Sequence, residues 1–359
     1  MEGRNNMNEA KLNQVVKSIN PLQQDVMALV QQRLDSLTKP PGSLGKLEDI
    51  VKQLGGITGN VLPLITQKAV LVMAADHGVV AEGVSAFPQE VTPQMVYNFL
   101  AGGAAINVLA KQAGAEVICT DVGVAADLEH PKLRMKKVAK GTANIAKGPA
   151  MTREQAIAAL LVGIETAQEQ IAAGVNLLAT GDMGIGNTSP STAIVAVLMG
   201  RPVEEVVGRG TGIDNPGLER KIQVIKQAIA INQPDPEDGL DVLGKVGGLE
   251  IAALAGSILG AAAGGVPIVI DGFISTAAAL IAATLAPASV NYMLPSHCSQ
   301  EPGHILALSH LGMEPMLNLS LRLGEGTGAV LAFYLVEAAC QIIRDMATFE
   351  EAGVANSEQ

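Results

Sequence analysis

Ala69-Val70-Leu71-Val72-Met73-Ala74-Ala75, followed by Asp76-His77-Gly78, is the stretch of sequence that decides the fold class of this chain. An apolar run without polar alternation is typical of a strand that is buried on both faces, as the strands of a parallel sheet are. The run then stops at an aspartate, a histidine and a glycine. The sequence therefore predicts a buried strand that ends in polar residues.

Four further apolar runs end in small or polar residues in the same way. They are Ala115–Thr120 before Asp121, Leu177–Thr180 before Gly181 and Asp182, Pro267–Ile270 before Asp271, and Val290–Met293 before Pro295, Ser296 and His297. Helical stretches such as 94–111 and 153–173 lie between the runs, so strands and helices alternate. This alternation predicts an α/β fold with a doubly wound, mostly parallel sheet.

The polar residues that end the predicted strands are candidates for a binding site. In open α/β sheets, ligands bind beyond the carboxyl ends of the strands. We therefore expect one crevice to gather the side chains of Asp76, Asp121, Asp182, Asp271 and His297.

The two ends of the chain read as helices. Leu22, Val26, Val30 and Leu34 fall at four-residue spacing, which places them on one helical face. After residue 329 the chain again becomes helical with a broadly apolar side. We predict a small helical domain made of residues 1–65 together with 331–359, and a large α/β catalytic domain over residues 66–330.

The composition argues against several classes of function. The 359 residues carry a net charge of −11, whereas non-specific nucleic-acid binding requires a basic face. The three cysteines form no CxxC pair, so we expect neither a disulfide framework nor a zinc finger, and a reducing cytoplasm fits best. The opening MEGRNNMNEAKLNQ lacks the apolar segment of a secretory signal.

The most apolar stretch, Ile251–Ile270, resembles a membrane span in length only. It contains four glycines and Pro267, and it runs directly into Asp271. We therefore predict a buried helix followed by a buried strand, and no membrane span.

Two glycine-rich segments could hold an anion. Gly181–Pro190 follows a predicted strand and precedes a helix, so its backbone N–H groups are available to a phosphate, although a tight turn explains the glycines equally well. Gly208–Asp214 is followed by Lys221, whose ammonium group suits a phosphate monoester, although a solvated lysine gives the same pattern. Neither segment has the GxGxxG or GK[ST] spacing of the common nucleotide-binding loops.

Three more segments carry reactive side chains. Ser296–His304 contains two histidines, a cysteine and a glutamate, but the spacing is not that of a zinc site, and a polar pocket lining is expected. Asp76-His77 with Ser85 hints at a hydrolase triad, yet the chain has no G-x-S-x-G elbow. In Gly324–Gly328, Glu325 stands among glycines. It is either an exposed turn residue or a carboxylate whose pKa burial would raise toward that of a useful base.

Taken together, the motifs resemble those of the nicotinate-nucleotide–dimethylbenzimidazole phosphoribosyltransferase family, which makes the lower-ligand nucleotide of cobalamin. The similarity extends from about residue 33 to 345. The segments that carry it are 39–45 (KPPGSLG), 75–78 (ADHG), 85–92, 102–107 (GGAAIN), 181–188, 208–212, 296–304 and 324–328 (GEGTG). The resemblance implies a Rossmann-like large domain, a small helical domain from both termini, and a homodimer.

The resemblance also implies a reaction and a set of site residues. Ribose 5-phosphate would pass from nicotinate mononucleotide to 5,6-dimethylbenzimidazole with inversion at C1′, giving α-ribazole 5′-phosphate and nicotinate. Glu325 would be the base. Asp182 stands where this family usually has Glu, which keeps the charge with a shorter reach. The phosphate would be bound by Lys221, the backbone around Gly184 and Gly210, and Ser299, and the acceptor base by Ser85, Phe87, Gln89 and Gln94.

The chemistry of this reaction is consistent with those residues. Nicotinate leaves from a pyridinium and needs no general acid, whereas the attacking benzimidazole must lose one N–H proton, which one carboxylate can take. A nearby second carboxylate could stabilise an oxocarbenium-like state. No metal or other cofactor is expected, because the phosphate is not the leaving group. Two alternatives stay open: a nicotinate mononucleotide hydrolase, and a non-catalytic nucleotide-binding protein.

Overall fold

The fold was analysed in a computed structural model, which describes residues 2–355. Its centre is a six-stranded sheet in the order β3-β2-β1-β4-β5-β6, in which every neighbouring pair is parallel. The strands are β1 (Lys68–Ala75), β2 (Ala115–Gly123), β3 (Arg134–Met135), β4 (Leu177–Met183), β5 (Ile268–Ile270) and β6 (Met293–Pro295). The predicted doubly wound, Rossmann-like α/β fold is therefore confirmed.

The strand order reverses between β1 and β4. The chain builds the sheet outward from β1 through β2 to β3, and then returns to the other side of β1 with β4, β5 and β6. The connections on the two sides of this switch point leave in opposite directions. In sheets of this kind, ligands bind beyond the carboxyl ends of the strands at the switch point, which here are the ends of β1 and β4.

The boundaries differ from the sequence-based expectation at several strands, and at β2 Asp121 lies inside the strand, two residues before its end. Asp182 lies inside β4, one residue before its end, rather than after it. The run Val290–Met293 is mostly a 3-10 helix, η2 (Pro287–Tyr292), and the strand β6 begins only at Met293. The reason is Pro287, whose fixed φ suits the first turn of a helix and whose missing N–H does not suit a central strand.

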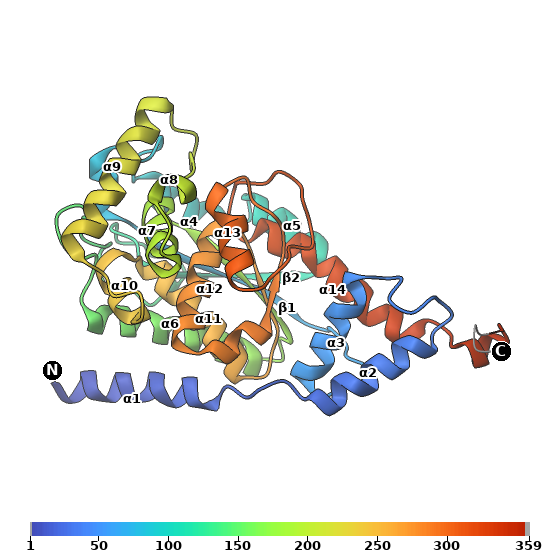
Figure 1. The fold of residues 1–359 in the computed structure, drawn as a ribbon. Helices are drawn as coiled ribbons and strands as arrows, with labels where there is room; N and C mark the ends of the chain where they lie inside the picture. The colour runs from blue at the N-terminus through green and yellow to red at the C-terminus, as the bar shows by residue number, and fades with distance from the viewer. Residues whose placement is uncertain (1, 356–359) are drawn as a thin grey trace.

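Helices cover both faces of the sheet (Figure 1). Side chains of β1 alternate between two cores: Leu71 and Met73 join one hydrophobic cluster, while Val70 and Val72 join the other. The first cluster includes α6 (Arg153–Ala172), α11 (Leu249–Ala263) and α12 (Phe273–Leu285). The second includes α3 (Lys46–Thr58), α4 (Val91–Ala101), α5 (Ala105–Ala113) and α14 (Thr327–Asp345).

Further helices lie between these elements in the sequence. They are η1 (Gly78–Glu82), α7 (Thr188–Met199), α8 (Val203–Val206), α9 (Asn215–Asn232), α10 (Gly239–Val246), α13 (Pro302–His310) and α15 (Phe349–Ala352).

Glycines bring α6 and α11 into backbone contact. A Cβ atom added at Gly163 would lie 1.8 Å from the carbonyl oxygen of Ala253, and one added at Gly256 would lie 1.9 Å from that of Leu160. No side chain fits in either gap. The two helices therefore pack through their backbones and hold the loop before α11 close to the sheet.

The terminal helices occupy two different places. Figure 1 shows α2 (Gln24–Ser36) and α3 beside the far end of α14, whereas α1 (Glu2–Ser18) extends along the outer side of α6. Leu34 and Leu54 share one hydrophobic cluster with Val70 of the sheet, and Lys11 of α1 forms an ion pair with Glu165 of α6. The division into domains 1–65 plus 331–359 and 66–330 stays a prediction.

One helix of the described chain, α14, is long and apolar enough to cross a membrane by length and composition, with a mean hydropathy of 1.3. More than half of it is buried in the protein, which is typical of a core helix. The stretch Ile251–Ile270 forms the buried helix α11 and then the buried strand β5, as its sequence predicts.

Candidate active site

The segment Gly324–Gly328 lies directly over the end of β4. Gly324, Glu325 and Gly326 have φ angles of +89°, +64° and +94°, a left-handed backbone that glycine adopts freely and glutamate does not. A Cβ atom at Gly181 would lie 2.5 Å from the carbonyl oxygen of Glu325. The strained glutamate is therefore held against a strand that has no side chain at the contact.

The Glu325 carboxyl is nearly buried, with 6% of the residue exposed. Its Oε2 accepts a hydrogen bond of 3.3 Å from the backbone N–H of Ile106, in the first turn of α5. Burial raises the pKa of Glu325 above its usual value. The Ile106 N–H opposes that shift, and the charge of Asp271 adds to it. The result is a carboxylate that is more basic than an ordinary glutamate, which favours proton abstraction.

Asp182 lies close enough to Glu325 for their charges to interact. Burial, followed by the charge of Asp271, raises the pKa of Asp182 to about 8, although the side-chain amide of Asn187 lowers it by donating to Oδ2 over 2.9 Å. Glu250 and Glu325 also raise it. Asp182 is therefore mainly protonated at pH 7, which makes it a hydrogen-bond donor rather than a fixed negative charge.

Asp271 anchors the loop that carries Glu325. Its Oδ2 accepts from the backbone of Gly326 over 3.1 Å, and its Oδ1 accepts from Ala329 over 2.9 Å. Both donors belong to the N-terminus of α14, where a carboxylate is favourably placed. Burial raises the pKa of Asp271, and His297, at 3.9 Å from Oδ1, opposes the shift. Asp271 thus positions the site through the backbone.

A buried His–Glu pair closes the other side of the site. His77 Nε2 lies 2.6 Å from Glu250 Oε1, and neither side chain is accessible to solvent to any useful extent. A Cβ atom at Gly184 would lie 3.0 Å from Glu250 Oε1 and 3.1 Å from His77 Nε2. Gly184 therefore lies directly on this pair, and the pair supports the loop that follows β4.

A cationic pocket adjoins the acidic residues. Lys221 of α9 is completely buried, and its Nζ donates to Thr188 Oγ1 over 2.7 Å and to the carbonyl of Gly208 over 3.1 Å. Burial lowers the pKa of Lys221 to about 8, against the opposing charge of Glu301. A Cβ atom at Gly210 would lie 3.4 Å from Nζ, so the backbone of the second glycine-rich loop passes close to the ammonium group.

Residues 299–304 form the wall opposite Lys221. Glu301 Oε1 accepts from the N–H of Gly210 over 2.9 Å, and the N–H of Glu301 donates to Ser299 Oγ over 3.3 Å. The N–H of Ser299 in turn donates to His304 Nδ1, and His304 Nε2 lies 2.9 Å from Thr276 Oγ1. Burial lowers the pKa of His304 to about 3, so this histidine is neutral and structural.

The predicted acceptor-base residues lie on the segment before α4 and on α4 itself. Ser85 Oγ is 3.5 Å from Thr211 Oγ1, so this segment touches the second glycine-rich loop. Phe87 is half-exposed, Gln89 is partly buried and Gln94 is exposed. Their binding of an acceptor stays a prediction.

The structure thus joins most of the predicted phosphate and catalytic residues. Glu325 and Asp182 share the end of β4, while Lys221, Gly210 and Ser299 meet through Thr188 and Glu301. Of the strand-end acids, Asp76 and Asp121 belong to a neighbouring region, where Asp76 Oδ2 accepts from Ala125 and Asp121 pairs with Lys137. Over residues 2–355, no group of three or more His, Cys, Asp or Glu side chains could hold a metal ion.

Several residues of the site had no role in the sequence-based expectation. Asn187 and Thr188 lie in the glycine-rich segment Gly181–Pro190, but no role was predicted for either side chain. Glu301 was considered only as a possible metal ligand. Glu250 had no sequence signal at all, because it lies on an apolar helix far from β1 in the sequence.

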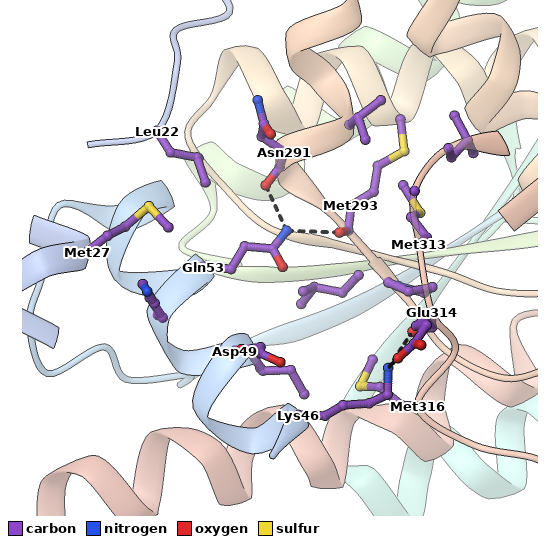
Figure 2. Close-up of a pocket in the computed structure, with 17 residues that line it drawn as sticks. Leu22, Met27, Lys46, Asp49, Gln53, Asn291, Met293, Met313, Glu314 and Met316 are labelled. Carbon is purple, nitrogen blue, oxygen red and sulfur yellow. Dashed lines mark hydrogen bonds and ion pairs between the residues drawn. The ribbon is translucent and has the colours of Figure 1, made fainter. Parts of the chain in front are cut away.

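A cavity of the described chain lies away from these residues. It has a volume of about 690 Å³ and lies between α3 and the edge strand β6 (Figure 2). Methionines such as Met293 and Met316 line it, and the Lys46–Glu314 ion pair lies at its side. It contains none of the predicted site residues, so its size does not mark the place of the chemistry.

Comparisons with known proteins are consistent with one family. A family model described as phosphoribosyltransferase matches residues 19–354. The chain is 59% identical over 349 residues to the nicotinate-nucleotide–dimethylbenzimidazole phosphoribosyltransferase of Chloroflexus aggregans, covering 97% of this chain and 99% of that one. It is 58% identical over 345 residues to the same-named protein of Desulforamulus reducens, covering 96% and 98%. A crystal structure of CobT from Thermus thermophilus superposes with a TM-score of 0.90 at 52% identity, covering 93% of this chain and 100% of that one.

Proposed function

Because the chain belongs to the nicotinate-nucleotide–dimethylbenzimidazole phosphoribosyltransferase family, we propose that Glu325 is the base of its reaction and that Lys221 binds the substrate phosphate. The chain is a phosphoribosyltransferase of cobalamin lower-ligand synthesis. It transfers ribose 5-phosphate from nicotinate mononucleotide to 5,6-dimethylbenzimidazole and gives α-ribazole 5′-phosphate and nicotinate. The proposals below concern how its residues do so.

The main support for this mechanism is that two consecutive residues connect the acidic side chain of Asp182 to the buried ammonium group of Lys221. Asn187 contacts Asp182, and the next residue, Thr188, contacts Lys221. A nucleotide whose phosphate lies at Lys221 would therefore extend its ribose toward Asp182 and Glu325. This is the arrangement that a transfer at C1′ needs, because the phosphate is held at one end while the bond exchange occurs at the other.

The proton balance assigns one base and no acid. A benzimidazole nitrogen forms a bond to C1′, and the C1′–N bond to nicotinate breaks with its electron pair going to the pyridinium ring. The acceptor then carries one excess N–H proton, which Glu325 takes up through a carboxylate oxygen. Attack on the face opposite the leaving nicotinate inverts C1′. The raised pKa of Glu325 makes its carboxylate a stronger base than an ordinary glutamate.

Asp182 takes a different role from the one its charge suggests. With a pKa of about 8 it carries a proton at pH 7, so it binds as a donor, for example to a ribose hydroxyl. Its neutral form also avoids placing a second negative charge beside Glu325. We propose that Asp182 orients the ribose while Glu325 accepts the proton.

We also propose which residues bind the acceptor base, where the protein is located in the cell and what its oligomeric state is. The segment 85–94 contacts the second glycine-rich loop, and its half-exposed Phe87 offers an aromatic face to a flat base. We assign the acceptor to Ser85, Phe87, Gln89 and Gln94. We also infer a cytoplasmic homodimer.

The assay that tests this function mixes the protein with nicotinate mononucleotide and dimethylbenzimidazole. We expect α-ribazole 5′-phosphate, identified by the α configuration at C1′. Release of free ribose 5-phosphate would instead indicate the hydrolase. Binding of nicotinate mononucleotide without any product would indicate a nucleotide-binding protein.

A further inference from the structure

Glu301 occupies the place where the second glycine-rich loop would hold an anion. It is the residue that caps α13, and its side chain crosses to the loop, where Oε1 accepts the N–H of Gly210 over 2.9 Å. Within the described part of the chain, nothing donates to the buried Oε2. A buried carboxylate oxygen without a donor is costly, so its position calls for a reason beyond stability.

The loop is shaped around this carboxylate. A Cβ atom at Gly208 would lie 1.8 Å from Glu301 Oε2 and 2.5 Å from the Cδ atom. No other residue fits at position 208 while Glu301 stays in place. The backbone at Gly208 and Gly210 therefore encloses a carboxyl group from two sides.

The groups around Glu301 are those that bind a phosphate monoester. They are a backbone N–H of a glycine-rich loop, the hydroxyl of Thr188 and the ammonium of Lys221. Lys221 is buried and makes two hydrogen bonds, which leaves its third proton free. The charge of Glu301 also favours the protonated form of Lys221 against burial.

We propose that Glu301 is an internal competitor of the substrate phosphate: it occupies the Gly208–Gly212 loop when the site is empty, and the phosphate of the nucleotide displaces it from the N–H of Gly210. The inference rests on the proposed function for the identity of the nucleotide. It assigns Glu301 as a positioning residue that sets phosphate affinity, not as a group that reacts.

Competition between Glu301 and the phosphate favours release of the product. Substrate and product carry the same 5′-phosphate, so contacts to the phosphate stabilise both equally and do not lower the barrier between them. Without Glu301 as a competitor, the loop would bind the phosphate of the product as tightly as that of the substrate, and product release would be slow. A carboxylate that returns to the loop favours release of either.

The test is phosphate binding by the Glu301→Gln variant, which keeps the size of the side chain and an acceptor for Gly210 but removes the negative charge. Calorimetric titration with inorganic phosphate should give a Kd lower than that of the wild type by roughly tenfold, the order expected from losing one nearby like charge. The control is Glu219→Gln, an exposed glutamate on the same helix as Lys221, which should leave the Kd unchanged. An unchanged or higher Kd for folded Glu301→Gln overturns the proposal.

Steady-state kinetics separate competition from a purely structural role. In Glu301→Gln, the KM for nicotinate mononucleotide should fall and inhibition by α-ribazole 5′-phosphate should strengthen, while kcat does not rise. If circular dichroism shows that the Gln variant is unfolded, Glu301→Asp withdraws the carboxylate from Gly210, and it too must bind phosphate more tightly. The phosphate titration needs no turnover, so its result stands apart from whether the chain catalyses the proposed transfer.

Discussion

The side-chain amide of Asn187 donates to Asp182 Oδ2 over 2.9 Å, and this contact joins the acidic half of the site to the cationic half. Asn187 is the N-cap of α7, a position where asparagine normally accepts from the first turn of its own helix. Here it makes no such bond, because its side chain reaches back to β4. The N-terminus of α7 therefore lacks a side-chain cap, and the Asn187 side chain instead holds the carboxyl group of Asp182 in place.

Replacing Asn187 with Ala should therefore disturb the chemistry more than the fold. The Asn187 amide lowers the pKa of Asp182, so its removal should raise that pKa further and free the carboxyl to rotate. We expect kcat to fall by roughly tenfold to a hundredfold, the equivalent of one hydrogen bond to an ionisable group. The comparison is Asn291→Ala, an exposed asparagine distant from Glu325, which should keep wild-type kcat.

Activity should fall at low pH through Glu325 and at high pH through Lys221 and Asp182, both of which have a pKa of about 8. Burial raises the pKa of Glu325, so activity should fall as pH decreases through a value above 4.5, where the base becomes protonated. Lys221, with a pKa of about 8, loses its charge above that pH, so the KM for nicotinate mononucleotide should rise. Nicotinate riboside, which lacks the phosphate, should show the same acid limb of kcat/KM but a smaller rise in KM, because only the ionisation of Asp182 then weakens ribose binding. A rise of equal size with the riboside would argue against Lys221 as the phosphate ligand.

Asp182 should destabilise the protein as pH rises. Its folded pKa of about 8 lies above its usual value of 3.8, so the folded state binds more protons than the unfolded state between these limits. The stability that the protonated form contributes is complete below about pH 4 and is lost progressively as pH rises from there to about 8.

Asp182→Asn, which cannot ionise, should therefore be more stable than the wild type at pH 9 and similar to it at about pH 4. Urea unfolding at both pH values measures the difference. An equal stability difference at both would show that Asp182 titrates normally in the folded protein.

The contact between α6 and α11 should not tolerate a side chain. In Gly256→Ala, the new Cβ would lie 1.9 Å from the carbonyl oxygen of Leu160, so the helices must separate. We expect a loss of about 3 kcal/mol or more in the free energy of unfolding. Gly244→Ala is the matched control: this helical glycine has its nearest neighbour at 3.5 Å, and the better helix propensity of Ala should leave it neutral or slightly stabilised.

The sequence predicted the sheet because its strands are buried on both faces, which makes runs such as Ala69–Ala75 legible without any tertiary information. It also predicted that Asp182 and Asp271 would lie at one edge, since parallel strands end together. It did not predict that Asp271 would bind the backbone of α14 and not a ligand. Such a contact joins residues 55 or more positions apart through loop geometry.

Glu250 and Glu301 show the other limit. Each is a single glutamate whose partner, His77 or the N–H of Gly210, is remote in the sequence. The spacing of apolar residues predicts which face of a helix or strand is buried. It does not predict which residues distant in the sequence that face will contact. The prediction of a strand over Val290–Met293 was wrong for most of that run, which is the 3-10 helix η2. The run is short and apolar like a buried strand, and only Pro287 upstream indicates a helical turn.

The most direct test of the account is the turnover of Glu325→Gln with nicotinate mononucleotide and dimethylbenzimidazole, followed as α-ribazole 5′-phosphate. Gln keeps the size of the side chain and cannot take a proton from the acceptor. The account predicts a loss in kcat of roughly a hundredfold to ten-thousandfold with nucleotide binding largely kept, while Glu314→Gln, an exposed glutamate remote from Glu325, keeps full activity. Turnover of Glu325→Gln near that of the wild type would contradict the assignment of Glu325 as the base.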